Sequence, residues 1–545
     1  MTHSLKFLPL GGSGEIGMNM NLYTYNNHWL MVDCGITFGD EIGIDILMPD
    51  TKFIEERRQS LVGIVLTHAH EDHIGALPYL WNRLRVPLYA TPFTSLIIKD
   101  KLRQAGVLDE AEINVIPLGG QIELDPFKIE FISLTHSIPE PNALAIQTPA
   151  GTVIHTGDWK IDPEPLIGTI TDKNRLQEYG NQGVLALVSD STNAFVEGRT
   201  GSESHVKKYL TQIIGEQKNR VIVTLFASNI ARMRTCMEAA HQHGRHVVLA
   251  GRSLERMYSA AQACGYLDGL PEVLTDKQAL SYKKRDLLYL CTGSQGEPRA
   301  ALSKIAYDLH PCVSIEAGDT VIFSSREIPG NERDIYAIQN QLAHRGVRII
   351  RDIDNTIHVS GHPARDDLRE MFALVRPQIL IPVHGEEQHM QEHARLGKEA
   401  GIPHTIVPYN GAIIEVNAHK PKIVEEVHSG RLCLDGDQVV PYSSPHIKER
   451  FKLSHQGITF ITFFTDRWGD MTEPMISFVG LCENEEVTRK LREATYKELA
   501  KLLDNVEPTL LENDYKVGEM CQIAVRRATR AFSGKKPMVI THVAR

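Results

Sequence analysis

Short apolar runs, broken by glycine-rich turns, dominate the first 200 residues. SLKFLPLGG and MNLYTYNNHWLMVDCG predict strands, and the apolar run LVGIVLTHAH is followed by the helical pattern HIGALPYLWNRL. FKIEFISLTHSIPEPNALAIQTPAGTVIHTGDWKID predicts three more strands, and QGVLALVSDSTNA predicts a buried one. Several of these strands end next to an acidic residue or a histidine.

From about Thr200, helical and strand patterns alternate. GSESHVKKYLTQIIGEQ predicts a helix, with Thr200 and Glu203 as its capping box, and NRVIVTLFAS opens a series of strand–helix units. Such alternation predicts a parallel sheet flanked by helices. NTIHVSGHPARDDLREMFALVRPQILIPVHGE then returns to the earlier pattern, so the middle block is expected to be inserted into the first domain.

The last hundred residues or so predict a separate small α+β domain. ITFITFFTD and PMISFVG are strand-like, and NEEVTRKLREATYKELAKLLDNV is helical. MCQIAVRRATRAFSGKKPMVITHV predicts a further helix and a final strand.

Composition adds limits rather than a function. The 545 residues are 42% hydrophobic and 23% charged, which is ordinary for globular chains, and the net charge of −10 gives no overall basic surface for a nucleic acid. Eight scattered cysteines without a CxxC pair argue against a disulfide framework and fit a reducing cytoplasm. Neither a signal peptide nor an apolar run of about 18 residues is present, so we predict no membrane span.

The segment HAHEDH concentrates metal-binding side chains directly behind a strand-like run. Neutral imidazoles and a carboxylate are ligands that zinc or a similar divalent ion prefers. His68 and His70 stand two apart and face the same side of an extended segment, whereas Asp72 and His73 follow on a turn. A polar turn that caps a helix is the alternative, but four such residues in six positions favour a metal site.

A dinuclear site needs more ligands than one turn offers. The other candidates stand at strand ends: His136 in LTHSIP, Asp158 in HTGDWK and His384 in IPVHGE. Each taken alone is typical of a structural residue, and their joint appearance after apolar runs makes them candidates.

These motifs resemble those of the metallo-β-lactamase superfamily, whose signature is H-x-H-x-D-H followed by a distant histidine and aspartate. The chain is also similar to the β-CASP branch of nucleic-acid-processing enzymes, through Asp190 in SDST, His362 in HVSGHPARDDL and His384 in PVHGE. Within that branch, LGGSGEIGMN, FASNIAR, TGSQGEP, SSREIPGNE and VRRATRAFSGKKPMV closely resemble the ribonuclease J family. The resemblance covers nearly the whole chain.

The resemblance implies an α/β fold: a metallo-β-lactamase αββα sandwich with an inserted β-CASP α/β domain and a small C-terminal α+β domain. The expected segments are residues 1–200 for the first part of the metallo-β-lactamase domain, 201–355 for the β-CASP domain, 356–443 for the second part with a linker, and 444–545 for the C-terminal domain.

The resemblance also implies two zinc ions, with Mn²⁺ or Mg²⁺ as alternatives. His68, His70 and His136 would hold one ion, and Asp72, His73 and His384 the other, with Asp158 bridging both. Asp33 would orient the ligand loop from behind, although a turn-capping aspartate is nearly as good an interpretation.

Roles in catalysis follow from the same resemblance. With Asp72, the catalytic residues would be His362, which would protonate the leaving 3′ oxygen, and Asp190, which would orient it. A structural hydrogen bond or a phosphate contact is the alternative for His362. The residues expected to bind a 5′-terminal monophosphate are Ser228, Asn229, His358, Ser360, Gly361 and His362. An ordinary helix N-cap is the other interpretation of the FASN segment.

The resulting hypothesis is a zinc-dependent ribonuclease of the cytoplasm. It would degrade single-stranded RNA with a 5′-monophosphate from 5′ to 3′, with some endonuclease activity, in RNA maturation and decay. The family further suggests a homodimer or homotetramer formed through the C-terminal domain, and RNA-decay or ribosome-associated partners. A β-CASP nuclease acting on DNA, a small-ester metallohydrolase and a non-catalytic RNA-binding scaffold are the alternatives.

Overall fold

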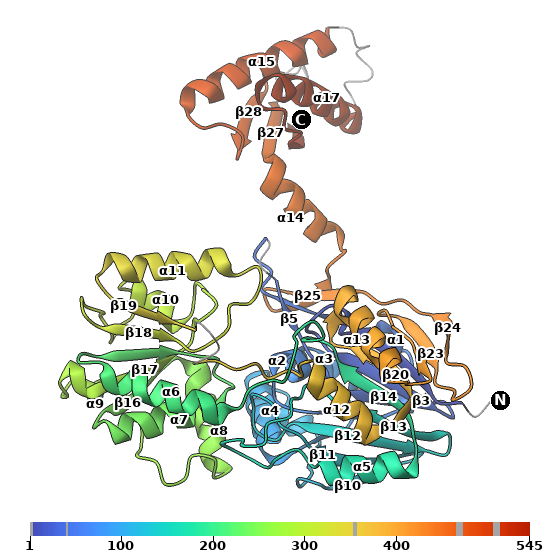
Figure 1. Cartoon of the computed structure of the whole chain (residues 1–545). Helices are drawn as coiled ribbons and strands as arrows, with labels where there is room; N and C mark the ends of the chain where they lie inside the picture. The colour runs from blue at the N-terminus through green and yellow to red at the C-terminus, as the bar shows by residue number, and fades with distance from the viewer. Residues whose placement is uncertain (1–3, 40–41, 353–356, 465–471, 505–512, 545) are drawn as a thin grey trace. The chain divides into compact units, whose positions relative to one another are not determined.

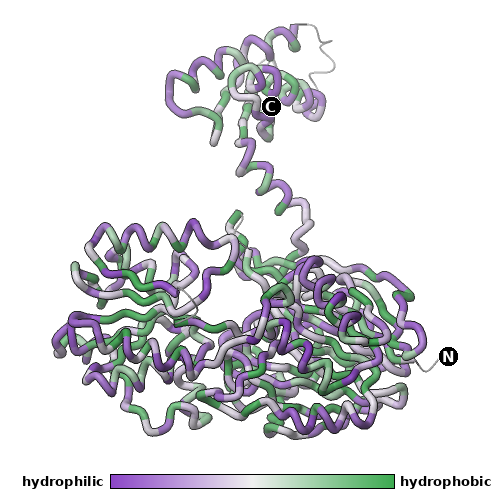
Figure 2. Tube along the Cα trace, in the orientation of Figure 1, coloured by the Kyte–Doolittle hydropathy of each residue, from purple (hydrophilic) through white to green (hydrophobic). Residues whose placement is uncertain are grey.

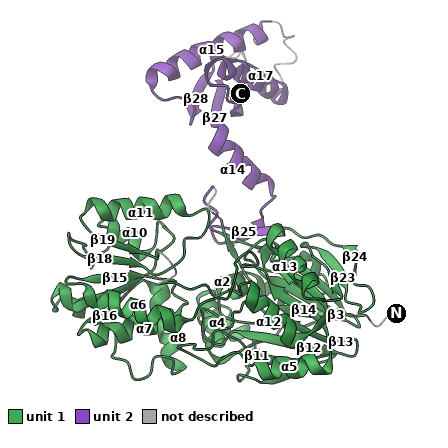
Figure 3. Cartoon of the chain, viewed as in Figure 1, with its two compact units in different colours: residues 1–38, 46–430 green, residues 39–45, 431–545 purple. Residues whose placement is uncertain are grey.

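The computed structural model describes residues 4–39, 42–352, 357–464, 472–504 and 513–544 (Figure 1). The chain divides into two compact units, one of residues 1–38 and 46–430 and one of residues 39–45 and 431–545 (Figure 3). Within the described ranges, no helix is long and apolar enough to cross a membrane.

Two sheets form the centre of the first unit. The eight-stranded sheet has the order β24 (Lys422–Glu426), β23 (Ala412–Glu415), β1 (Lys6–Gly11), β3 (Met20–Tyr25), β4 (His28–Val32), β7 (Leu61–Val65), β8 (Leu88–Ala90) and β9 (Ile113–Val115). The seven-stranded sheet has the order β10 (Gln121–Leu124), β11 (Phe127–Ser133), β12 (Asn142–Thr148), β13 (Gly151–His155), β14 (Val184–Asp190), β20 (Pro377–Val383) and β22 (His404–Thr405). Figure 2 shows their strands as largely hydrophobic segments.

One buried core joins the two sheets face to face. It contains Phe7 and Leu30 from the first sheet and Phe131, Leu144 and Ile381 from the second. A second core packs the outer face of the seven-stranded sheet against helices that carry Leu176, Phe372 and Leu396 among others. These helices are α5 (Lys173–Gln182), α12 (Arg365–Val375) and α13 (Glu387–Glu399), while α3 (Leu77–Leu84) and α4 (Pro92–Gln104) belong to the eight-stranded sheet's side. The predicted αββα sandwich is confirmed.

The sandwich brings several strand ends to one edge. Strands β13, β14 and β20 run parallel to one another, as do β4, β7 and β8. The segments that follow β7, β13 and β20 carry the HAHEDH motif, Asp158 and His384, and β14 itself ends at Asp190. Short β2 (Ser13–Gly14) pairs with β21 (Gly385–Glu386), which fixes the N-terminal glycine loop beside His384.

The inserted domain is built on a five-stranded sheet with all neighbours parallel, as predicted. Its order is β16 (His246–Ala250), β17 (Leu287–Cys291), β15 (Val221–Thr224), β18 (Thr320–Phe323) and β19 (Arg348–Arg351). Its helices are α6 (Glu203–Glu216), α7 (Ile230–Gln242), α8 (Arg252–Ala263), α9 (Asp276–Ala279), α10 (Ala301–Ala306) and α11 (Glu332–His344). The apolar faces of strands and helices share one core.

The predicted capping box at the start of α6 is wrong. Ser202 is the N-cap, and its side chain accepts a hydrogen bond from Ser204 N at 3.1 Å. Thr200 instead donates its hydroxyl to His362 O at 2.7 Å, and Glu203 is buried in an ion pair with Arg232. The side chains of Thr200 and Glu203 therefore bind residues that are distant in the sequence and do not cap the helix.

The second unit contains the predicted α+β domain, preceded by the hairpin β25 (Arg431–Asp435) and β26 (Gln438–Pro441) and by α14 (Pro445–Gln456). Strands β28 (Met475–Val479), β27 (Ile458–Phe464) and β29 (Met538–Ala544) form its sheet, in that order. Helices α15 (Glu485–Leu503) and α17 (Asp514–Ser533) share a core with it through Phe463, Leu499 and Val525. The segment boundaries at residues 200, 355 and 443 stay a prediction.

Candidate metal centre

The HAHEDH motif lies across the junction of a loop and a short helix. Strand β7 ends at Val65, the chain continues as a loop with a bend at Ala69, and His70, in an extended conformation, is the N-cap of α2 (Glu71–Ile74). Asp72 and His73 therefore lie in the first helical turn. The side chain of His70 makes no capping hydrogen bond, so the motif gathers ligand-type side chains at a helix start without capping the helix through them.

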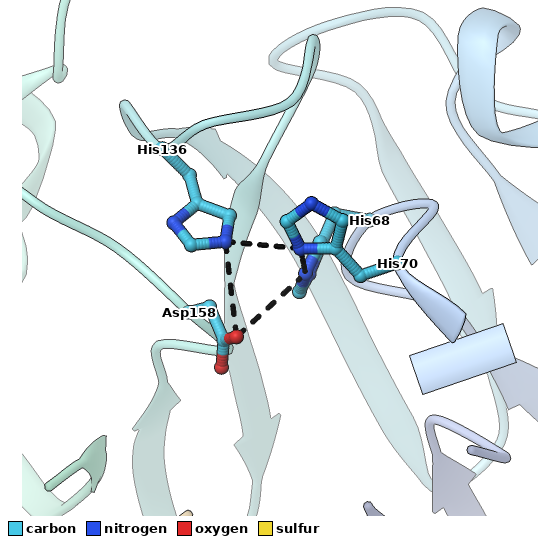
Figure 4. A group of neighbouring side chains, drawn as sticks. All are labelled: His68, His70, His136 and Asp158. Atoms are coloured by element: carbon cyan, nitrogen blue, oxygen red, sulfur yellow. Dashed lines mark hydrogen bonds and ion pairs between the residues drawn. The ribbon is translucent and has the colours of Figure 1, made fainter. Parts of the chain in front are cut away.

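Four side chains form a first group around one point (Figure 4). His70 Nδ1 lies 3.0 Å from His68 Nε2 and 3.1 Å from His136 Nε2. Asp158 Oδ2 lies 3.9 Å from His68 Nε2 and 3.8 Å from His136 Nε2.

A second group shares Asp158 with the first. It consists of Asp72, His73, Asp158 and His384, with one ligand atom of each lying within 4.8 Å of the others. His73 Nε2 is 3.2 Å from Asp158 Oδ1, and His384 Nε2 is 3.5 Å from Asp158 Oδ2 and 3.7 Å from Asp72 Oδ2. The structure thus brings all seven predicted ligands together, with Asp158 between the two sets.

Hydrogen bonds on the far nitrogens orient the imidazole rings. His73 Nδ1 donates to Asp33 Oδ2 at 2.7 Å, and His384 Nδ1 donates to Asn19 Oδ1 at 3.0 Å. His136 Nδ1 donates to a backbone carbonyl, that of Gly361. A proton fixed on one ring nitrogen leaves the lone pair of the other directed into the group, which is how ligating histidines are usually supported.

Burial and charge set the protonation of the cluster. Burial lowers the pKa of His68 and His136 well below the usual range and lowers the pKa of His70 to about 4. Burial alone would raise the pKa of Asp158, but His384 and His73 outweigh it and hold that pKa well below its ordinary value. The first group therefore presents neutral imidazoles and an ionised carboxylate at pH 7.

This donor set fits divalent ions. Asp158 Oδ1 is buried and, within the described residues, has no hydrogen bond of good geometry, although His73 Nε2 lies 3.2 Å away. His70 Nδ1 faces the Nε2 atoms of both His68 and His136 at about 3 Å, and neutral rings cannot satisfy all of these lone pairs with protons. Three imidazoles with one carboxylate, and two imidazoles with two carboxylates, are sets that zinc accepts.

A histidine–carboxylate pair borders both groups. His362 Nδ1 donates to Asp190 Oδ2 at 2.7 Å and lies 3.9 Å from Asp158 Oδ2. Burial would lower the pKa of His362, but the charge and hydrogen bond of Asp190 outweigh it and raise that pKa to about 9. Thr192 N and Oγ1 both donate to Asp190 Oδ1, so the carboxylate is held in one orientation.

The predicted phosphate-binding residues have different environments, and those that contact the metal-ligand groups are Ser228, Gly361 and His362. Ser228 Oγ is 3.1 Å from His70 Nε2, and Ser360 Oγ accepts from Asn193 Nδ2 at 2.8 Å. A Cβ on Gly361 would lie 2.6 Å from the His136 ring, so only glycine fits there. His358 Nδ1 is buried with no hydrogen-bond partner in the described part of the chain.

Asn229 does what the helix-cap interpretation predicts. It is the N-cap of α7, its Oδ1 accepts from Arg232 N at 2.9 Å, and its Nδ2 donates to Glu203 Oε1 at 3.3 Å. Its amide is therefore engaged inside the fold.

Sequence reasoning missed three supporting side chains. Asn19 Oδ1 binds His384 and its Nδ2 donates to Asp72 O at 3.1 Å, which ties two of the ligand segments together. Lys101 Nζ donates to both carboxylate oxygens of Glu71, at 2.6 and 2.7 Å. For Asn19 a signal existed, since it ends the LGGSGEIGMN motif; Glu71 and Lys101 gave none beyond opposite charge.

The sandwich, the inserted parallel-sheet domain and the paired ligand groups define a metal-dependent hydrolase of the metallo-β-lactamase class with a β-CASP insertion. Residues 15–170 match the metallo-beta-lactamase superfamily, and residues 218–342 match the "Ribonuclease J, beta-CASP domain". Residues 346–408 match the "Zn-dependent metallo-hydrolase RNA specificity domain" and residues 445–545 the "Ribonuclease J C-terminal domain".

Whole-chain relatives point the same way. The chain is 43% identical to "Ribonuclease J" of Sinorhizobium meliloti, over 99% of this chain and 97% of that protein. It is 34% identical to "Ribonuclease J" of Helicobacter pylori strain B128, over 99% and 79% of the two chains, and 34% identical to "Ribonuclease J2" of Bacillus subtilis, over 86% and 85%. The chain belongs to the ribonuclease J family, which confirms the resemblance found in its motifs.

A solved structure supports the fold alone. A protein of unknown function from Enterococcus faecalis V583 superposes with a TM-score of 0.53 at 18% identity, over 75% of this chain and 99% of that one.

Proposed function

We propose that this protein is a dinuclear zinc ribonuclease that removes nucleotides one by one from the 5′-monophosphate end of single-stranded RNA, with some endonuclease activity. The observation that carries the proposal is the convergence of seven ligand-type side chains, shared between two groups through Asp158, in a chain of the ribonuclease J family. The proposal places the protein in RNA maturation and decay in the cytoplasm, where its eight unpaired cysteines fit the reducing conditions.

The two ligand groups have separate tasks. His68, His70 and His136 would hold one ion, Asp72, His73 and His384 the other, and Asp158 both. When bound, the two zinc ions supply a hydroxide at neutral pH and neutralise charge on the scissile phosphate. The imidazole-rich set favours zinc over Mg²⁺ or Mn²⁺, which prefer oxygen ligands.

His362 is the proposed proton donor to the departing 3′ oxygen. Asp190 keeps the ring protonated near neutral pH and points it beside the shared Asp158. A positioned acid of this kind contributes about 10²- to 10⁴-fold in rate.

The 5′-terminal phosphate is proposed to bind between two segments of different origin. Ser228 offers its hydroxyl next to His70, with Asn229 fixing the loop from behind, and Ser360, Gly361 and His358 offer the opposite wall. A pocket one nucleotide from the metal centre would measure off single nucleotides.

A groove in the first unit supports a polyanionic substrate. It has a volume of about 1200 Å³ and is lined by residues of α4, α8 and α10 and of the loops that follow β16, β17 and α10. Its basic side chains are those of Arg252, Arg256, Arg299 and Lys304, against the acidic Asp100 and Glu255. This gives an acidic protein a local surface of positive charge for RNA phosphates.

The C-terminal domain is proposed to join two chains into a homodimer, from which a homotetramer would be built. Residues that alternate with the buried Ile461 and Phe463 lie on the other face of its sheet. Strand register places apolar side chains there: Ile458, Phe460, Met475, Val479, Met538 and Ile540. Met475 and Val479 are 64% and 56% exposed, and a flat apolar face of this kind is suited to self-association.

The deciding experiment uses a 5′-monophosphate RNA labelled at its 5′ end. Wild type should release labelled mononucleotide, and His68→Ala should not. A 5′-triphosphate RNA should be cut more slowly, and a matched single-stranded DNA should resist. Zinc-loaded protein that leaves RNA intact, or that prefers DNA or a thioester, would refute the proposal.

A further inference from the structure

The inserted domain is joined to the sandwich by two crossover segments that lie side by side. The chain leaves through residues 200–203 and returns through residues 357–362. Thr200 Oγ1 donates to His362 O at 2.7 Å, and a Cβ on Gly201 would lie 3.1 Å from Val359 Cγ2. The return segment carries His358, Ser360 and His362. Within it, the carbonyl of Gly361 accepts a hydrogen bond from His136, and His362 Nδ1 lies 3.9 Å from Asp158 Oδ2.

One buried ion pair binds both crossover segments. The Arg232 side chain is fully buried, and the exposed fraction of Glu203's side chain is 3%. Arg232 Nη2 donates to Glu203 Oε1 at 3.0 Å, and Nε donates to Glu203 Oε2 at 3.1 Å. Arg232 Nη1 donates to Ile357 O at 2.8 Å and to Ser324 Oγ at 2.6 Å. Glu203 belongs to the outgoing segment and Ile357 to the returning one.

The same pair also holds the Ser228 loop. Glu203 Oε1 accepts from Asn229 Nδ2 at 3.3 Å, and Arg232 N donates to Asn229 Oδ1 at 2.9 Å. The preceding residue, Ser228, contacts His70 through its hydroxyl. Arg232 and Glu203 therefore hydrogen-bond to both of the segments that are proposed to bind the 5′-terminal phosphate.

We propose that Arg232 and Glu203 are positioning residues for RNA cleavage, which hold the Ser228 loop and the 358–362 segment in register with the metal ligands. The inference rests on the proposed function. In the described residues, neither side chain hydrogen-bonds to any of the seven ligand-type residues, so metal binding does not depend on the pair directly. A buried ion pair adds little stability over apolar side chains of similar size, which leaves placement as its contribution.

The test compares a large and a small phosphodiester substrate in the full chain. The double variant E203Q/R232M removes both charges, so that neither is left buried alone. Because a misplacement of about 1 Å costs about 100-fold, kcat/KM for 5′-monophosphate RNA should fall about 100-fold. Hydrolysis of bis(p-nitrophenyl) phosphate, which needs the metal centre but neither segment, should change by less than about threefold, and zinc content should stay at the wild-type value.

A second buried pair in the same domain serves as the matched control. Arg220 Nε donates to Asp319 Oδ2 at 3.1 Å, and the two side chains are 4% and 5% exposed. Arg220 precedes β15, at the opposite end of the strand from the Ser228 loop. The variant R220M/D319N loses an equivalent ion pair and should keep the wild-type ratio of RNA to small-substrate activity. Arg232→Lys keeps the positive charge but loses the planar set of guanidinium donors. Its RNA activity should lie between those of E203Q/R232M and wild type.

Four outcomes test the inference and the proposed function on which it rests. A selective loss of RNA activity in E203Q/R232M, absent from R220M/D319N, supports it. Parallel loss of both activities in E203Q/R232M, or an equal selective loss in the control, overturns it, because the pair would then act on folding alone. Wild type that hydrolyses the small substrate but no RNA would instead refute the proposed function.

Discussion

Asp33 Oδ2 accepts a hydrogen bond from His73 Nδ1 at 2.7 Å, behind the predicted second ion. Asp33 also accepts from Thr67 N at 2.8 Å, which fixes the loop that leads to the ligand motif. Burial would lower the pKa of His73, but the charges of Asp158, Asp72 and Asp33 outweigh it and raise that pKa well above the usual range. Asp33 thus both orients the ring and increases its basicity toward a cation.

Replacing Asp33 by asparagine should weaken the second metal position. Asparagine tolerates the positive φ of 64° at this residue, so the change removes charge rather than backbone shape. Zinc affinity for that position should fall about 10- to 100-fold, measured by titration against a competing chelator. Asp172→Asn, which alters an ordinary helix cap, should leave zinc affinity unchanged. If Asp33→Asn binds zinc at both positions with wild-type affinity, Asp33 acts only as a turn-capping residue.

Removing zinc should destabilise the protein reversibly. The ions bind only the folded arrangement, so at a free zinc concentration of about 1,000 times Kd each ion adds about 4 kcal/mol to the free energy of unfolding. Tm should fall after dialysis against a chelator and recover when zinc is returned. His384→Ala should show a smaller zinc-dependent shift than wild type. If Tm does not change when zinc is removed or returned, and metal-free protein is fully active, the proposed metal site is wrong.

The Asp190→Asn variant should shift the basic limb of the pH–rate profile. His362 must be protonated to donate, so the rate should fall as pH rises through its pKa of about 9. Asparagine removes the charge that raises this pKa, so the basic limb should move to lower pH. Single-turnover cleavage of RNA across pH 6–10 measures it, since saturating metal and an excess of enzyme over RNA isolate the chemical step. An unmoved limb would favour a phosphate contact over proton donation.

Charge reversal in the groove should weaken binding of long RNA selectively. In the described residues, Arg252 and Lys304 pair with no carboxylate, so Arg252→Glu and Lys304→Glu act on the surface alone. KM for an RNA of about 30 nucleotides should rise about tenfold, and its salt dependence should weaken because fewer counterions are released. Hydrolysis of bis(p-nitrophenyl) phosphate should not change. Lys284→Glu is the control. Lys284 lies just before β17, at the end of that strand opposite the groove, and the variant should keep the wild-type KM.

A charge on the open sheet face should separate the proposed dimer. Phe460→Glu places a carboxylate among apolar side chains opposite Ser477 and Ile540, where burial in an interface is costly. Light scattering should then report the mass of one chain where wild type gives two or four. Ile523→Glu, on α17 and 43% exposed, should keep the wild-type mass. An unchanged mass in Phe460→Glu would remove this face from the assembly.

Local patterns predicted most of the elements, because their causes are local. Alternating and continuous apolar runs predicted the central strands of both large sheets but not β8, β9, β10, β22, β23 and β24, and strand–helix alternation predicted the parallel sheet of the inserted domain. The two predicted helix N-termini differ in this respect: Asn229 caps α7 as its residue type favours, whereas Thr200 does not cap α6. Backbone propensity acts over a few residues, and a partner from across the fold outweighs it.

The chemistry of the site was readable from residue type, but its supports were not. Imidazoles and carboxylates at strand ends suggested ligands, and strands that end at one sheet edge explain why the seven side chains meet. Nothing in the sequence couples Asn19 to His384, 365 positions away, or Lys101 to Glu71. These contacts depend on how the sheets pack, and packing is a property of the whole chain.

The sequence by itself determined the elements, the fold class, the family and the set of side chains able to bind a metal, because those depend on residue types and their spacing. Only the tertiary structure decided which nitrogen of each ring faces the centre, which carboxylate is shared, and that Arg232 and Glu203 join the two crossover segments. Ring orientation and buried pairing are set by hydrogen-bond partners that folding brings from distant parts of the chain, where no local pattern records them.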